Sequence, residues 1–146
     1  MTFRIREVDP FDDKEAYDEL QTLHRLTFFD SAPMPDLYKG HWWLVRDEAK
    51  VNVAFAGMIP AITDLNTGYF TRVGVLHVAR GHRLQKRLLS VVERRARKNG
   101  WTAIISDTTD NPPSANAMIS GGYKIFEPAH RWAFPHSIYW KKDLTK

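Results

Sequence analysis

The sequence predicts one domain of the α+β (α/β) class over residues 1–146, with a mostly antiparallel mixed sheet of about seven strands flanked by about four helices. Three observations lead to this prediction. A chain of 146 residues has room for one domain with one core. Its hydrophobic share of 43% and its many aromatic side chains exclude a disordered chain. Strand-like and helix-like apolar patterns alternate along it, with strands both before and after a central helix.

The first half of the chain carries one strand, one long helix and three further strands. Alternating apolar residues predict a strand over 2–8, which ends at Asp9-Pro10. Asp12, with Glu15 three positions later, resembles a capping box, and apolar side chains at helical spacing then predict a helix to about residue 28. Apolar and β-branched runs predict strands over 41–46, 51–59 and 69–78.

The second half is organised around a helix over 83–98, in which one apolar stripe indicates the buried face and Gly100 provides a stop signal. A short continuous apolar strand follows over 102–106, of the type buried on both faces. A short helix over 114–120 and two last strands over 123–126 and 137–141 complete the order.

The residue types exclude several classes of protein. The chain has no cysteine, which removes disulfides, thiolate metal sites and cysteine nucleophiles and fits a reducing compartment. The six histidines show no metal-ligand spacing, so no metal is expected. No apolar run approaches the ~20 residues of a membrane helix, and the first residues do not resemble a signal peptide. We therefore expect a cytoplasmic protein without a membrane partner, as a monomer or a homodimer.

Positive charge is concentrated in one segment. Residues 72–98 carry nine basic side chains and a single acidic one, Glu93, whereas residues 1–71 carry seven basic and twelve acidic side chains. Most charge runs of this kind form a solvated helix face, and the alternative is a site for the phosphates of a nucleotide cofactor or a nucleic acid. Both interpretations remain open at this point.

The junction between the strand at 69–78 and the helix at 83–98 has the properties of a phosphate site. A turn containing Gly81 leads into the helix, and the first turn of a helix presents unpaired amides and a partial positive charge. Arg80, Arg83, Lys86 and Arg87 crowd this end, although cations there oppose the helix dipole. The segment matches neither a Walker loop nor the dinucleotide fingerprint.

The run from Val75 to Leu89 resembles the acetyl-CoA motif of the GCN5-related N-acetyltransferases, Val-x-Pro-x-x-(Arg/Gln)-Gly-x-Gly-x-(Gly/Ala)-x-x-Leu. The matching residues are Val75, Arg80, Gly81, Leu88 and Leu89, and the departures are His77, Arg83 and Gln85. The block from Asn111 to Tyr123 resembles a second motif of that family, and 138–144 resembles its closing strand. The resemblance covers nearly the whole chain, which it identifies as a single N-acetyltransferase-like domain.

The resemblance implies acetyl-CoA as cosubstrate and a sheet that splays between its fourth and fifth strands. The backbone of Val73 and Val75 would pair with the pantetheine arm, and the amides from Gly81 to Lys86 would wrap the pyrophosphate. Asn111 and Ser114 would bond the pantetheine arm, with a turn residue and a helix cap as their alternative roles. The implied cofactor-binding residues are Val73, Gly74, Val75, Arg80, Gly81, His82, Arg83, Leu84, Gln85, Lys86, Asn111 and Ser114.

The implied reaction moves the acetyl group of acetyl-CoA to a primary amine of a small molecule or a protein. Met118 stands where the family has a tyrosine that acts as acid. Tyr69 stands where some relatives carry a glutamate base, and Asp107, after the buried strand, is the nearest acidic candidate. Catalysis by proximity, with water carrying the protons, is the default mechanism. Of Trp42 and Trp43, which point to opposite faces of their strand, one is expected in the core and the other could line the acceptor groove.

Two other functions compete with this interpretation. The chain could bind acyl-CoA without transferring the acyl group, since the usual tyrosine is missing and the phosphate loop is altered. It could also bind nucleic acid through the basic helix 83–98, but the apolar stripe of that helix is aliphatic and offers no platform for base stacking.

Overall fold

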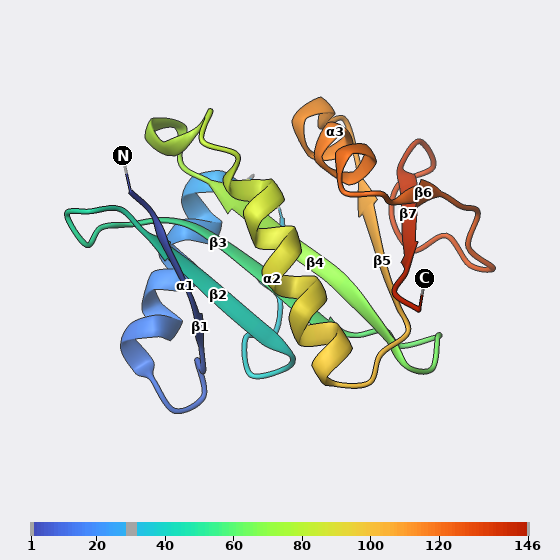
Figure 1. The fold of residues 1–146 in the computed structure, drawn as a ribbon, viewed down its shortest axis with the longest axis horizontal. Coiled ribbons are helices and arrows are strands. Elements are labelled where there is room, and N and C mark those ends of the chain that lie inside the picture. The colour runs from blue at the N-terminus through green and yellow to red at the C-terminus, as the bar shows by residue number, and fades with distance from the viewer. Residues whose placement is uncertain (1, 29–31, 146) are drawn as a thin grey trace.

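The computed structural model describes residues 2–28 and 32–145, which form one seven-stranded sheet in the order β1-β2-β3-β4-β5-β7-β6 (Figure 1). All strand pairs are antiparallel except β4 with β5. The predicted fold class is confirmed. The elements in chain order are β1 (Arg4–Val8), α1 (Lys14–Thr27), β2 (His41–Arg46), β3 (Asn52–Pro60), β4 (Thr67–Val75), the 3-10 turn η1 (His77–Ala79), α2 (Leu84–Lys98), β5 (Ala103–Thr108), α3 (Pro112–Ser120), β6 (Lys124–Ile125) and β7 (Ile138–Asp143).

Three details differ from the prediction. The described residues form three α-helices and one 3-10 turn, where about four helices were expected. The cap of α1 is Asp13 rather than Asp12, because the Asp13 carboxylate accepts the Ala16 amide at 3.2 Å. The strand predicted over 69–78 ends at Val75, because the chain turns where the Ala79 amide bonds the Leu76 carbonyl at 2.9 Å. The remaining bounds lie within two residues of those expected.

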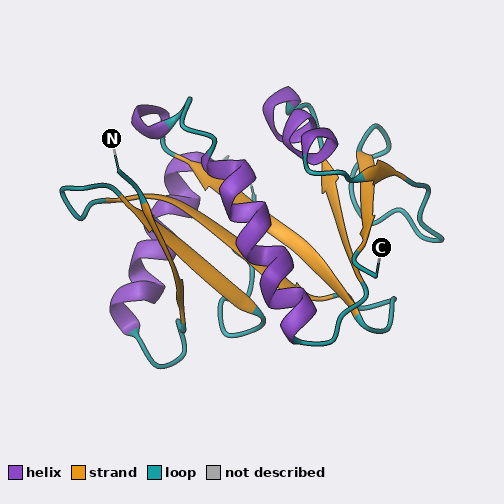
Figure 2. Ribbon diagram, viewed as in Figure 1, coloured by secondary structure: helices purple, strands orange, loops and turns teal. Residues whose placement is uncertain are grey.

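Helices cover both faces of the sheet, α1 on one face and α2 with α3 on the other (Figure 2). Each face has its own apolar cluster. Trp42 packs in the cluster that contains Leu20 of α1, and Trp43 in the cluster that contains Leu88 of α2. Both rings are buried, at 0% and 3% exposure, so the expectation that one of them could line an acceptor groove is wrong.

The sheet opens between β4 and β5, as expected. These strands are paired in parallel only where Thr67, Gly68 and Tyr69 lie beside Ala103, Ile104 and Ile105. Beyond this point they diverge (Figure 1), and the Ser106 hydroxyl still reaches the Phe70 carbonyl at 2.8 Å. The opening therefore begins directly after Tyr69.

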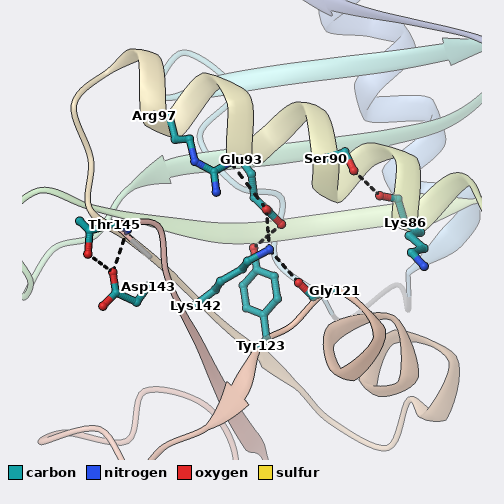
Figure 3. A network of polar contacts seen from close by, with 9 residues as sticks. All are labelled: Lys86, Ser90, Glu93, Arg97, Gly121, Tyr123, Lys142, Asp143 and Thr145. Atoms are coloured by element: carbon teal, nitrogen blue, oxygen red, sulfur yellow. Dashed lines mark hydrogen bonds and ion pairs between the residues drawn. The ribbon is translucent and has the colours of Figure 1, made fainter.

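A buried polar network joins α2 to the C-terminal half of the sheet (Figure 3). The Lys142 ammonium lies 2.8 Å from the Glu93 carboxylate and donates to the Gly121 carbonyl at 2.8 Å. The Tyr123 hydroxyl donates to the other Glu93 oxygen at 3.4 Å, and burial with the nearby carboxylate raises the pKa of this phenol. Lys142 of β7 pairs with Ile104 of β5, which in turn pairs with Gly68 of β4. The network therefore lies beside the segment in which β4 and β5 are still hydrogen-bonded.

Among the described residues, no helix has the length and apolar character needed to cross a membrane.

Candidate active site

The edge of β4 that faces β5 exposes backbone groups where the two strands diverge. The pairing of β3 with β4 shifts register between Gly57 and Met58, so that Phe70 and Arg72 face consecutive residues of β3. After this bulge the Leu76 amide bonds the Val53 carbonyl at 2.8 Å. Because backbone groups alternate between the two edges of a strand, the amides and carbonyls of Val73 and Val75 point into the opening.

A cavity of about 750 Å³ lies beside this edge and extends to the start of α2 and to α3. It is lined by ten of the residues predicted to bind the cofactor, which are Val73, Gly74, Val75, Arg80, Gly81, Arg83, Leu84, Gln85, Lys86 and Asn111. These ten residues lie up to 38 positions apart in the sequence, and the fold brings them together around one hollow.

Two predicted residues do not line the cavity. His82 is exposed, and its ring lies 5.0 Å from that of Phe3. Ser114 is buried at 7% exposure, and its hydroxyl donates to the side-chain oxygen of Gln85 at 3.3 Å. The Asn111 side chain caps α3 by accepting the Ser114 amide at 3.2 Å. The cap role belongs to Asn111, which also lines the cavity, and Ser114 instead ties α3 to α2.

The start of α2 keeps its first-turn amides available. Its cap residue Arg83 adopts a left-handed conformation with φ 57°, and no side chain caps the helix. Gly81 has φ +86° with open space around it, so the turn depends on the conformational freedom of glycine rather than on lack of room. With Arg80, Arg83 and Lys86 on the cavity wall, this corner combines amide donors with three cations, which is a favourable environment for phosphate.

The cavity is completed by residues that the sequence analysis missed. Along α3, Pro113, Asn116, Ala117 and Ser120 follow Asn111 at helical spacing, and this periodicity could have identified them. Thr27 comes from the end of α1 on the other face of the sheet. A Cβ built on Gly74 would lie only 2.3 Å from the Thr27 hydroxyl oxygen, so α1 packs directly on β4 at this point.

Tyr69 and Asp107, the two predicted catalytic residues, lie together where the opening begins. The Tyr69 hydroxyl donates to Asp107 Oδ1 at 2.5 Å, and the Trp132 indole donates to the same oxygen at 2.9 Å. The Trp132 ring stands edge-on to Tyr69 at 5.7 Å and to Tyr139 at 4.6 Å. Neither Tyr69 nor Asp107 lines the 750 Å³ cavity.

These contacts define different chemical properties for the two residues. Burial, followed by the charge of Asp107, raises the pKa of Tyr69, so this phenol is a hydrogen-bond donor and not a base at neutral pH. Asp107 Oδ1 is held by two donors, whereas Oδ2 has no hydrogen-bond partner among residues 2–28 and 32–145. Asp107 therefore keeps one carboxylate oxygen free, close to the point where β4 and β5 diverge.

The position at which the family has its acidic tyrosine is occupied by Met118. Met118 is 3% exposed and packs in the core, so nothing at this position can donate a proton.

His24 is 5% exposed, and its Nε2 accepts a hydrogen bond from Arg72 at 3.4 Å. Burial, and secondly the charge of Arg72, lowers the pKa of His24, which keeps this imidazole neutral. In the described part of the chain, no group of three or more histidine or carboxylate side chains could hold a metal ion.

Comparison with known proteins identifies structural neighbours and no sequence relatives. No family model matches the chain, and no curated protein sequence resembles it significantly. An acetyltransferase of the GNAT family from Staphylococcus aureus superposes with a TM-score of 0.73 at 18% identity over 98% of this chain and 99% of its own. The ribosomal-protein-S18-alanine N-acetyltransferase from Escherichia coli gives 0.75 at 11% identity, over 98% and 94%. The NatC complex bound to Gag peptide and CoA gives 0.72 at 15% identity, over 97% and 96%.

Proposed function

We propose that this chain, which has the fold of the GCN5-related N-acetyltransferase superfamily, transfers the acetyl group of acetyl-CoA to a primary amine. The observation that carries the proposal is the free edge of β4 beside a cavity that ends at an uncapped basic helix. CoA is an extended molecule with amides along its arm and a diphosphate behind them. The edge offers backbone partners to the amides, and the start of α2 offers partners to the diphosphate. The structural neighbours include acetyltransferases and a complex that holds CoA.

The reaction begins with a neutral amine nitrogen, which attacks the thioester carbonyl while CoA is held along β4. Negative charge develops on the carbonyl oxygen, and the Val75 amide, which points into the opening, is the donor that would stabilise it. The nitrogen then loses a proton to water, and the thiolate leaves and takes up a proton. Since Met118 has no proton to give, water supplies it in this scheme, and proximity of the two substrates provides most of the acceleration.

Asp107 attracts and orients the acceptor in this proposal. An amine with a pKa near 10.4 arrives mainly as a cation at neutral pH. Tyr69 and Trp132 hold one oxygen of the Asp107 carboxylate in place beside the point where β4 and β5 diverge, and the other oxygen is free to meet the cation. At about 4 Å in water the attraction amounts to roughly 1 kcal/mol, or about a fivefold effect on acceptor binding.

The test is thiol release from acetyl-CoA in the presence of a panel of primary amines, including polyamines, arylalkylamines and peptides with free N-termini. Amine-dependent release, with acetylated amine as the second product, supports the proposal. Binding of CoA without release for any amine supports the alternative of an acyl-CoA-binding domain, which the buried Met118 favours. If CoA does not bind, both functions are excluded.

A further inference from the structure

A basic groove runs between the edge strand β1 and helix α2, on the side of α2 away from the cofactor cavity. It consists of two adjoining hollows of about 820 and 250 Å³, which share Ile5, Val91 and Arg94. Five cations line the larger hollow, namely Arg4, Arg46, Lys50, Arg87 and Arg94. This hollow shares no lining residue with the cofactor cavity, so it requires a separate explanation.

The cations outnumber the acidic side chains in this groove. Asp47 and Glu48 are the two carboxylates of the larger hollow. In the smaller hollow, Glu7 is already paired with Arg95 at 2.9 Å, whereas Lys98 adds a further positive charge. The groove is therefore positive along its whole length.

Part of this positive charge has no carboxylate partner. Arg4 and Arg46 are direct cross-strand partners, an arrangement in which like charges destabilise a sheet. Among the described residues, neither Arg4 nor Arg94 pairs with a carboxylate. An anionic ligand in the groove would relieve this repulsion and would provide a partner for Arg94.

The backbone of β1 adds a second recognition element. β1 is the first strand of the sheet and pairs with β2 alone, so every second amide and carbonyl along its outer edge lacks a strand partner. Cations alone would be enough to protect such an edge from aggregation. The adjoining hollow and Arg94 on its wall, a cation unpaired among the described residues, exceed that requirement.

We propose that the basic groove binds an acidic polypeptide segment in extended conformation, which adds as a strand to the free edge of β1. Side chains alternate along a strand, so Asp or Glu at every second position would lie on the same face of the sheet as Ile5 and would meet Arg94 and Lys98 of α2. A second copy of this chain does not fit, because it would bring its own Arg4 and Arg6 to the same edge. Single-stranded nucleic acid lacks a stacking platform, since Phe3 and Trp43 are buried.

The experiment compares two labelled hexapeptides of equal composition by fluorescence anisotropy, Asp-Val-Glu-Val-Asp-Val and Asp-Glu-Asp-Val-Val-Val. The alternating peptide should bind at least tenfold more tightly, because only its acidic side chains share one face. Hydrogen exchange of the β1 amides should slow when it binds. Equal affinity for the two peptides, or unchanged exchange in β1, would overturn the proposal.

Variants separate the groove from general electrostatics. Arg94→Glu should lower the affinity for the alternating peptide at least fivefold. Lys124→Glu, the same charge change at an exposed position of β6, should leave this affinity unchanged. Arg4→Glu should also weaken it while raising the melting temperature, because it replaces a repulsive pair with Arg46 by an attractive one. Equal losses for Arg94→Glu and Lys124→Glu, or tighter binding of poly-uridine than of the peptide, would refute a peptide site. Thiol release from acetyl-CoA should be unchanged in Arg94→Glu, so the outcome is independent of the proposed acetyl transfer.

Discussion

Replacing Lys142 by methionine should destabilise the fold by about 2–3 kcal/mol, because the buried carboxylate of Glu93 then loses its main partner. At 2.8 Å and an effective dielectric constant of about 20, the attraction of this pair is roughly 6 kcal/mol before desolvation is subtracted. Removing one member of a buried pair typically costs about 3–5 kcal/mol. The Lys142 side chain is 25% exposed and Arg97 remains 4.0 Å from Glu93, so we expect a loss at or just below the lower end of that range.

The assay is urea unfolding of Lys142→Met, Glu93→Met and the double variant, which together form a double-mutant cycle. The double variant should be less destabilised than the sum of the single ones, with a coupling energy of at least 1 kcal/mol. The single loss corresponds to a decrease of roughly 6–10 °C in the melting temperature of a domain of this size. Lys141→Met, an exposed neighbour, should stay within about 0.5 kcal/mol of the parent. Additive effects of the two single variants would refute the idea that the network holds α2 against the C-terminal strands.

Three further predictions concern pH, catalysis and packing. Because the pKa of His24 is lowered in the folded protein, the unfolded chain binds more protons as the pH falls, and the free energy of unfolding should decrease from pH 7.5 to pH 5.5. This decrease should be smaller in His24→Gln, and an equal decrease in the parent and the variant would contradict the assignment. Asp107→Asn should raise KM for a cationic amine about fivefold, and the rate of acetyl transfer should still rise roughly tenfold per pH unit through neutrality. A plateau of the parent's rate near pH 6–7 that is absent in the variant would instead identify Asp107 as a general base. Gly74→Ala should lower the free energy of unfolding, measured in urea, by about 1–3 kcal/mol, because the added Cβ would overlap Thr27. Gly121→Ala should lower it by less than about 1 kcal/mol, and equal losses would argue against close packing of α1 on β4.

The order of elements was predictable because it depends on local periodicity, and so was the phosphate corner, where a glycine turn and a basic helix are adjacent in the chain. The outward orientation of Val73 and Val75 was expected only from the resemblance. Its physical cause is the bulge between Phe70 and Arg72, which depends on the register with β3 and leaves no local signal. The misplaced end of β4 has a local cause, since Val78 continues an apolar run but is 73% exposed in the turn that follows.

Tertiary contacts account for the parts of the site that were missed. Trp132 reaches Asp107 across 25 residues, and Thr27 reaches the cavity from a helix on the opposite face of the sheet. No spacing rule relates such positions. The basic groove was missed for the same reason, because the charge of α2 becomes a groove only when β1 brings Arg4 and Arg46 beside it.

The most direct test of the proposed function is the affinity for CoA, measured by isothermal titration calorimetry for the parent and for two charge reversals on α2. Lys86→Glu lies in the cavity wall, and Lys98→Glu lies twelve residues further along the helix, about 18 Å away. A diphosphate held at the start of α2 predicts that Lys86→Glu weakens CoA binding at least tenfold and that Lys98→Glu changes it less than twofold. Equal losses in the two variants, or no binding of CoA by the parent, would contradict the account.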